Sequence, residues 1–320
     1  MLTVDHEETF RITMNTLASC MEQIMPYLRD NSVFEVYANS DGKIWTDGYK
    51  GRQFTGLIMP AAQRKQIIVN VTSLTGQVVG SEKPFVDAEI PASPYFDKCR
   101  FQGNLPDIVA APTFNIRKHP KTIFTLRNYV EQEILSEHQY DVILRAIYEK
   151  KNIVAAGGTK SGKTTLLNAI LAEMSKLNDR IILIEDTPEL QCTAEDYVAL
   201  KTTSSMSMAD LLRNTLRMTP DRIVVGEVRG GEALALLEAW STGHGGGCST
   251  VHSNSAKDTL IRLENMISRV SLNPQQATIA QAVDYIVYLK YFGLQRKVED
   301  IIQIADFDPL TKQYVLKKVD

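Results

Sequence analysis

The sequence lacks three features that would each indicate a particular class of protein. No apolar run approaches the roughly 18 residues that a membrane-spanning helix needs. Residues 1–10 are acidic and contain no apolar core of a secretory signal. The 4 cysteines lie far apart and form no C-x-x-C pair, which argues against a zinc ribbon or a redox dithiol. We therefore expect a cytoplasmic chain with ordinary reduced thiols.

The chain also lacks a strong excess of charge of one sign. It has 35 Lys and Arg against 38 Asp and Glu, a formal net charge of -3. Proteins that bind nucleic acid through their overall charge are strongly basic, so no sequence-specific nucleic-acid partner is expected, although a local basic patch is compatible with this balance. What is present, 44% hydrophobic and 23% charged residues over 320 positions, is typical of a globular chain of two domains.

Residues 1–120 show a mixed pattern that predicts a smaller α+β domain. Apolar residues at helical spacing indicate a helix over 9–28, and a second helix is expected over 60–74, with Pro60 in its first turn. Asp41-Gly42 between two short apolar runs predicts a β-hairpin. Further strands are expected at 87–90, 98–101 and 108–118. His119-Pro120 ends this pattern, and residues 121–138 are interpreted as a linker.

Residues 139–320 are predicted to form an α/β domain that contains a P-loop. Strands and helices alternate along this part of the chain, which is typical of a parallel sheet covered by helices. The predicted strands are 152–156, 180–185, 221–226 and 249–252, and the predicted helices are 161–176, 207–217 and 232–240.

A complete phosphate-binding loop joins the first strand and helix of this domain. Its glycines allow backbone N–H groups to surround phosphate oxygens at the positive end of the following helix. Lys163 is expected to reach the β- and γ-phosphates of ATP, and the Thr164 hydroxyl is expected to bind Mg²⁺. The alternative is a chance glycine turn, which the apolar strand before the loop and the helix after it argue against. The predicted ATP-binding residues are Gly157, Gly158, Thr159, Lys160, Ser161, Gly162, Lys163, Thr164 and Thr165.

Two later apolar strands end in acidic residues. The first ends at Glu185-Asp186 and the second at Gly226-Glu227. A Mg²⁺–nucleotide site needs carboxylates that hold the water shell of the ion and orient the attacking water. We therefore predict Glu185 and Glu227 as catalytic and metal-site residues, with Glu227 as the first choice for orienting water. Either acid, taken alone, is equally compatible with a helix cap or a surface charge.

Two histidines flank a glycine run over residues 242–252. His244 and His252 alone are too few ligands for a metal site of the zinc type. A single histidine in such a segment is usually a hydrogen-bonded structural residue, and catalysis or sensing is the alternative. His252 is included among the candidate catalytic residues on this basis.

The order of these segments resembles the secretion-ATPase superfamily. Its Walker A, Asp, Walker B and His boxes correspond here to the P-loop, Ile184-Glu185-Asp186-Thr187-Pro188-Glu189, residues 221–229 and residues 242–252. The long glycine-containing His box, and the absence of a tetracysteine module, place the resemblance in the branch that serves type IV secretion and conjugation.

This resemblance implies a RecA-like P-loop domain and ATP hydrolysis that powers conjugative DNA transfer or type IV secretion. It implies a ring-shaped homo-oligomer, a hexamer, attached peripherally to the inner membrane and working with the inner-membrane components of the channel. It also concerns the N-terminal domain, because Cys99-Arg100-Phe101 and residues 114–118 resemble segments that supply arginines to the nucleotide. Arg100 and Arg117 are accordingly predicted to stabilise charge on the γ-phosphate; the alternative is an exposed arginine on a strand.

Two other functions fit parts of the pattern. A switch that uses ATP only to assemble on DNA would share the RecA-like motif order, but it should carry a basic stripe that the net charge of -3 does not favour. A membrane-recruited scaffold with a vestigial site is disfavoured by the intact P-loop and acids.

Overall fold

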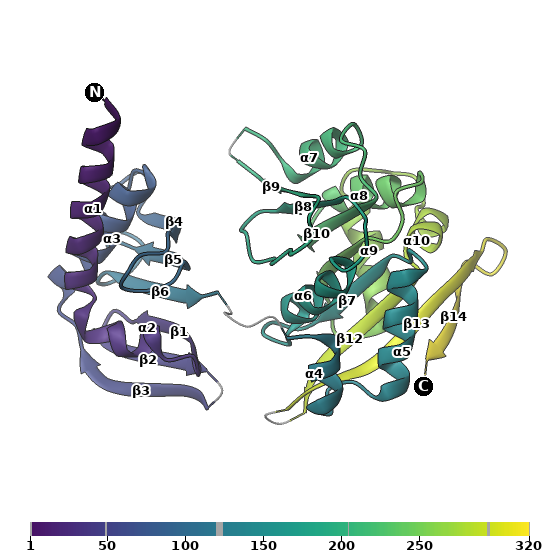
Figure 1. Ribbon diagram of the computed structural model, residues 1–320, viewed down its shortest axis with the longest axis horizontal. Coiled ribbons are helices and arrows are strands. Elements are labelled where there is room, and N and C mark those ends of the chain that lie inside the picture. Colours follow the sequence, from purple (N-terminus) through teal and green to yellow (C-terminus); the bar gives the residue numbers. More distant parts are fainter. Residues whose placement is uncertain (1, 49, 120–123, 204, 293–294, 320) are drawn as a thin grey trace. The chain divides into compact units, whose positions relative to one another are not determined.

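The computed structural model describes residues 2–48, 50–119, 124–203, 205–292 and 295–319. The chain divides into two compact units, Met1–Thr122 and Ile123–Asp320 (Figure 1). The predicted domain boundary at residues 120–121 lies outside the described residues. No described helix is both long enough and apolar enough to cross a membrane.

The first unit is an antiparallel sheet with helices packed on it. The strand order is β3-β2-β1-β6-β5-β4. The strands are β1 (Val33–Ala38), β2 (Lys43–Gly48), β3 (Gly51–Ile58), β4 (Phe85–Ile90), β5 (Cys99–Asn104) and β6 (Thr113–Lys118). The helices are α1 (Leu2–Cys20), the short 3-10 helix η1 (Glu22–Ile24), α2 (Met25–Arg29) and α3 (Ala61–Thr75). The α+β architecture follows the mixed pattern of the sequence.

The predicted hairpin and helices of this unit are present, with changed limits. Gly42, with φ of 85°, lies in the turn between β1 and β2. The helical stretch begins earlier than predicted and is interrupted after Cys20, while Met14, Leu17 and Ile24 of its apolar stripe are buried in the core. The helical spacing there therefore reflects core packing. Strand β3 was not predicted, because its residues show little apolar alternation, and all of them are partly or fully exposed.

The second unit is an eight-stranded sheet with the order β14-β13-β12-β7-β11-β10-β8-β9. The six strands from β12 to β9 are parallel, and β13 and β14 add an antiparallel pair at one edge. The strands are β7 (Ile153–Gly157), β8 (Ile181–Glu185), β9 (Tyr197–Lys201), β10 (Arg222–Val228), β11 (Cys248–His252), β12 (Tyr285–Phe292), β13 (Gln295–Asp308) and β14 (Gln313–Val319).

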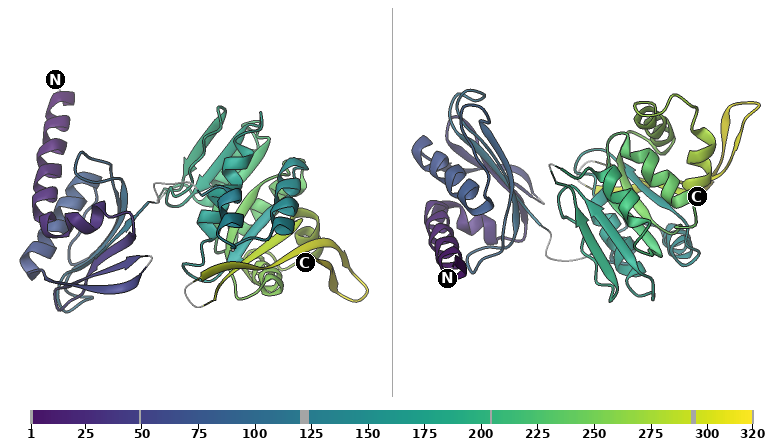
Figure 2. Two further views of the ribbon diagram at one scale, coloured as in Figure 1. Left: turned by 60° about the horizontal axis from the view of Figure 1, so that its bottom comes forward. Right: turned by 90° about the horizontal axis from the view of Figure 1, so that it is seen from above.

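Helices cover both faces of this sheet (Figure 2). Along β7, Val154 and Ala156 join the core under α7–α10, whereas Ile153 and Ala155 join the core under α4–α6. Strands buried on both faces are apolar along nearly their whole length, as β7 is and as β8 is up to Glu185. The helices are α4 (Leu126–Glu131), α5 (Glu137–Tyr148), α6 (Lys163–Met174), α7 (Met208–Thr215), α8 (Glu232–Ser241), α9 (Ala256–Ile267) and α10 (Gln276–Ala282).

The segment interpreted as a linker contributes to this core. Leu126 and Tyr129 of α4 are buried against α5 and α6, so residues 126–138 pack as part of the second unit. Helix α7 begins with a capping box, in which the Ser207 hydroxyl accepts from the Asp210 N–H and the Asp210 carboxylate accepts from the Ser207 N–H.

Candidate nucleotide site

Four predicted site segments meet at one edge of the parallel sheet. Strand β11 lies between β7 and β10, and β8 lies beyond β10. The P-loop follows β7, Glu185 ends β8, Glu227 lies near the end of β10, and His252 ends β11 directly beside Gly157. Ligands of open α/β sheets bind at the carboxyl ends of such strands. The fold therefore brings together residues that are nearly 100 positions apart.

The backbone of the P-loop requires its glycines at two positions. Gly157 has φ of 155°, and a Cβ there would lie 2.5 Å from the Leu289 carbonyl oxygen and 2.5 Å from Ser161 Oγ. Gly162 has φ of 97° and precedes α6, whose first residue is Lys163. Side-chain-bearing residues rarely adopt these angles. The loop can therefore close tightly around the amino end of α6, where backbone N–H groups point toward an anion.

Two buried polar side chains indicate that this loop receives a ligand. Ser161 is only 2% exposed, and its Oγ has no hydrogen-bond partner among the described residues. Such a hydroxyl is costly to bury unless another group completes its hydrogen bonding. Lys163 is 7% exposed, and its Nζ donates to the Gly158 carbonyl at 2.8 Å. A phosphate oxygen fits both the unpaired hydroxyl and the ammonium group.

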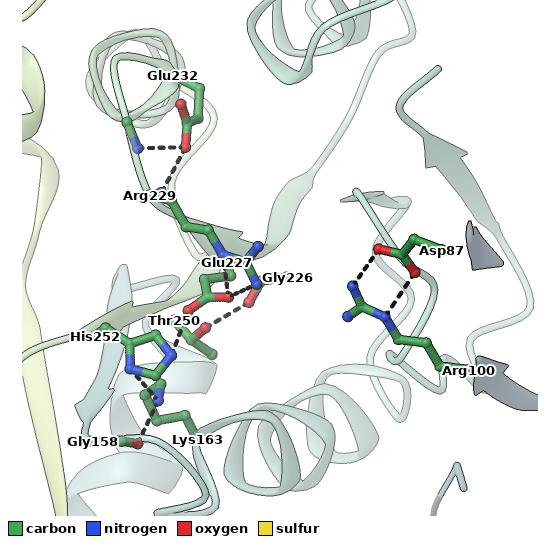
Figure 3. A network of polar contacts seen from close by, with 11 residues as sticks. Asp87, Arg100, Gly158, Lys163, Gly226, Glu227, Arg229, Glu232, Thr250 and His252 are labelled. Atoms are coloured by element: carbon green, nitrogen blue, oxygen red, sulfur yellow. Dashed lines mark hydrogen bonds and ion pairs between the residues drawn. The ribbon is translucent and has the colours of Figure 1, made fainter. Parts of the chain in front are cut away.

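His252 lies between Lys163 and Glu227 (Figure 3). Its Nδ1 is 3.5 Å from Lys163 Nζ, and its Nε2 is 3.1 Å from Glu227 Oε1. Burial and the neighbouring Lys163 charge lower the pKa of His252, against the opposing influence of Glu227. A neutral ring with its proton on Nε2 then presents a lone pair to the ammonium and an N–H to the carboxylate.

Glu227 has one carboxylate oxygen that is held by Arg229 and a second that is buried. Its Oε2 lies 2.7 Å from Arg229 Nε and 2.5 Å from the terminal Nη2 of the same side chain. Its Oε1 is buried but makes no hydrogen bond of good geometry among the described residues, despite the nearby His252. Glu232 fixes the turn after β10, because its Oε1 accepts the N–H groups of Arg229 and Gly230. One carboxylate oxygen is thus left with capacity to accept from water.

Glu185 has a different environment. It is 5% exposed, and its Oε1 accepts the backbone N–H groups of Glu189 at 2.8 Å and Leu190 at 3.0 Å. These bonds hold the loop that follows β8. The carboxylate is therefore engaged in shaping the site, and this favours Glu227 over Glu185 as the residue that orients water.

The two histidines of the glycine-rich segment lie at opposite edges of the sheet. His252 is at the carboxyl end of β11, whereas His244 precedes its amino end, in the turn after α8. They cannot share a metal ion. Within the part of the chain that the structure describes, no three His, Cys, Asp or Glu side chains form a metal-binding group. A Mg²⁺ ion, which keeps several waters and binds few protein groups, is compatible with the half-buried Thr164 beside Lys163.

Arg100 and Arg117 lie side by side in the first unit. They are direct cross-strand partners on β5 and β6. Arg100 forms a two-point contact with Asp87, Nη2 to Oδ2 at 3.1 Å and Nε to Oδ1 at 3.4 Å (Figure 3), and Arg117 is exposed. Their contact with a nucleotide stays a prediction.

Three residues at the site were not predicted from the sequence. Thr250 donates from Oγ1 to the Gly226 carbonyl at 2.8 Å and so ties β11 to β10. Arg229 holds the Glu227 carboxylate. Its position two residues after Glu227 in the sequence could have been used to predict this contact. Arg296 lies against Gly162, and no sequence motif predicts this position.

Comparison with known proteins agrees with these observations. The family described as "Type II/IV secretion system protein" matches residues 90–294. A probable conjugal transfer protein TrbB of Sinorhizobium fredii is 40% identical over 288 residues, 89% of this chain and 87% of that protein. The conjugal transfer protein TrbB of Rhizobium radiobacter is 40% identical over 300 residues, 93% of this chain and 91% of that protein.

A solved structure supports the fold. The Legionella pneumophila ATPase DotB aligns with a TM-score of 0.63 at 19% identity, covering 93% of this chain and 79% of that one. The predicted resemblance and the predicted α/β, RecA-like fold class are thereby confirmed.

Proposed function

This chain belongs to the type II/IV secretion system protein family, and from that membership we propose that it is an ATPase that powers conjugative DNA transfer or type IV secretion. The observation that carries the proposal is the array of Lys163, His252 and Glu227 beside a complete P-loop. The relatives that are 40% identical along nearly the whole chain are conjugal transfer proteins by name, which supports conjugation as the process.

The residues of the P-loop would bind the phosphates of ATP. The backbone N–H groups of residues 157–165 surround the anion, Lys163 contacts the β- and γ-phosphates, and Thr164 holds Mg²⁺. The ion, when bound, neutralises charge that develops on the phosphates. Lys163 Nζ donates to the Gly158 carbonyl, which orients its ammonium group over the loop.

Glu227 would orient the water that attacks the γ-phosphate. Its Oε1 has unused capacity to accept a hydrogen bond, and Arg229 fixes the other oxygen. Glu185, Arg100 and Arg117 complete the proposed set. Glu185 supports the loop after β8, and the two arginines of the first unit stabilise charge on the γ-phosphate.

His252 would couple the presence of the γ-phosphate to the environment of Glu227. Its neutral ring lies between the lysine that binds phosphate and the acid that orients water. A γ-phosphate that attracts the Lys163 ammonium withdraws positive charge from Nδ1 and so changes the polarity of the ring that faces Glu227.

The assembled protein is proposed to be a homo-hexameric ring in the cytoplasm, held peripherally at the inner membrane by components of a conjugation or type IV secretion channel. This is supported by the family and by the finding that no described helix can cross a membrane. After cell fractionation, high salt or carbonate should release the chain from membranes. If the chain stays with the membranes after both washes and is released only by detergent, peripheral attachment would be contradicted.

The direct test combines turnover with assembly. The purified chain should hydrolyse ATP only when Mg²⁺ is added, and its mass in solution with Mg-ATP should correspond to a ring. In donor cells that lack the endogenous gene, wild type should restore plasmid transfer and Lys163→Ala should not. Turnover without a divalent cation, or transfer supported by the inactive variant, would overturn the proposal.

A further inference from the structure

We propose that Arg296 is a nucleotide-binding residue that contacts the two phosphates shared by ATP and ADP from the β12–β13 hairpin. This rests on the proposed ATPase function and adds a residue on the side of the P-loop where no motif lies.

The β12–β13 hairpin places Arg296 beside the P-loop. Strand β12 borders β7 on the side opposite β11, and its residue Leu289 pairs with Gly157 at the start of the P-loop. The hairpin continues beyond this pair, and Arg296 lies directly across from Tyr291. A Cβ placed on Gly162 would lie 3.4 Å from Arg296 Cδ, 3.5 Å from Nη1 and 3.8 Å from Nε. The guanidinium group therefore lies alongside the residue that precedes Lys163.

Arg296 has few polar partners among the described residues. Within the described part of the chain, its polar contacts are confined to Tyr291, whose hydroxyl accepts from Nε at 3.1 Å and whose ring centroid is 5.5 Å from the guanidinium carbon. No described carboxylate forms an ion pair with Arg296. The guanidinium lies beside Gly162 at the amino end of α6, and the positive end of the helix repels a further positive charge. A polyanion on the loop converts this repulsion into attraction.

Ser161 is 2% exposed, and its hydroxyl has no hydrogen-bond partner among the described residues. It belongs to the same loop and indicates independently that a ligand atom completes this place. A guanidinium is suited to such a ligand because its planar N–H groups pair with two phosphate oxygens at once.

The direction of approach identifies which phosphates Arg296 contacts. Glu227 and His252 lie on the β10 and β11 side of the P-loop, so the phosphate that is transferred must lie toward them. Arg296 comes from the β12 side. It therefore faces the part of the nucleotide that remains after hydrolysis, and it should contribute to ADP and ATP binding alike while contributing little to the chemical step.

The test measures nucleotide affinity and turnover separately. Arg296→Ala should raise the Kd for ADP and for ATP by a common factor of about 10 or more, as expected for loss of a charge-assisted hydrogen bond. The KM for ATP should rise in parallel, and kcat at saturating ATP should stay within about twofold of wild type. Arg296→Lys should recover part of the affinity, because it restores the charge without the planar fork.

Two matched controls separate a ligand contact from hairpin stability. Lys297→Ala removes the neighbouring exposed cation of the same strand, and Tyr291→Phe removes only the hydroxyl that accepts from Arg296. Both should bind ADP nearly as wild type does, and all variants should melt within about 2 °C of it. Unchanged ADP affinity in Arg296→Ala, or an equal loss in Lys297→Ala, would overturn this inference while leaving the ATPase proposal in place. A wild-type chain that binds neither ADP nor ATP would instead overturn both.

Discussion

Lys163 Nζ lies 3.5 Å from Nδ1 of His252, although 89 positions separate the two residues in the chain. The parallel pairing of β7 with β11 produces this contact, because His252 is the register partner of Gly157. The other nitrogen of the imidazole, Nε2, contacts Glu227. A residue that binds phosphate is thereby linked to one that can orient water, and the variants below test each member of this array.

The first prediction concerns Lys163. Lys163→Ala should abolish ATP turnover, because the ammonium supplies the charge that meets the phosphates. The turnover, the circular dichroism spectrum and the melting temperature of the purified variant should each be compared with those of wild type. The fold should stay intact, because the side chain contacts the Gly158 carbonyl and His252 at the site and its removal disturbs no hydrophobic core. Near-wild-type hydrolysis would refute the P-loop assignment.

The second prediction separates the two acids. Glu227→Gln should retain Mg-ATP binding and lower kcat by at least about a hundredfold, because the amide keeps the shape but loses the charge that orients water. Glu185→Gln should retain more activity and should lower the melting temperature instead, because Glu185 anchors the N–H groups of Glu189 and Leu190. A working Glu227→Gln beside an inactive Glu185→Gln would reverse these roles.

The third prediction concerns pH and His252. Its pKa in the folded chain is lowered from the ordinary value of 6.5, chiefly by burial and then by Lys163. The unfolded chain therefore binds a proton more readily below pH 6.5, and the stability associated with the neutral ring is lost as the pH falls through that region. When the pH is lowered from 7.5 to 5.5, the melting temperature of wild type should fall further than that of His252→Gln. Identical losses in the two proteins would show that His252 does not titrate in this way.

The site was predictable from the sequence where a local motif coincides with a strand end. The P-loop, Glu185 and Glu227 each follow an apolar strand, and parallel strands bring their carboxyl ends to one edge. The separation of His244 from His252 was equally implicit in the predicted strand at 249–252, which places one histidine before it and the other at its end.

Other parts depend on tertiary pairing that no short motif expresses. Strand β9 is partly exposed, with burial alternating along only five residues. The β12–β13 hairpin is positioned by the pairing of β12 with β7, and the register of this pairing places Arg296 beside Gly162. The sequence near residue 296 contains no motif that would predict this position. The assignment of residues 126–138 failed for a related reason. Leu126 and Tyr129 become core residues only because α5 and α6 cover them.

The last prediction concerns Arg100 and Arg117, which are cross-strand partners in the first unit. If they stabilise charge on the γ-phosphate, Arg117→Ala should lower kcat by about a thousandfold, as removal of an arginine of this kind does in other phosphoryl-transfer enzymes. Ring assembly and melting temperature should change little, because Arg117 is exposed. Arg100→Ala should also lower kcat, and its loss of the exposed contact with Asp87 should cost no more than about 1 kcal/mol of stability.

A matched control is available on the same sheet. Arg52 on β3 is exposed and ion-paired with Asp47, so Arg52→Ala removes an equal charge and a similar contact without touching the proposed pair. Turnover should be unaffected in this variant. If Arg100→Ala and Arg117→Ala also keep full turnover, the nucleotide is contacted by the second unit alone. The first unit would then serve as a docking module for partners, and the force of the cycle would have to reach it by a route other than the nucleotide.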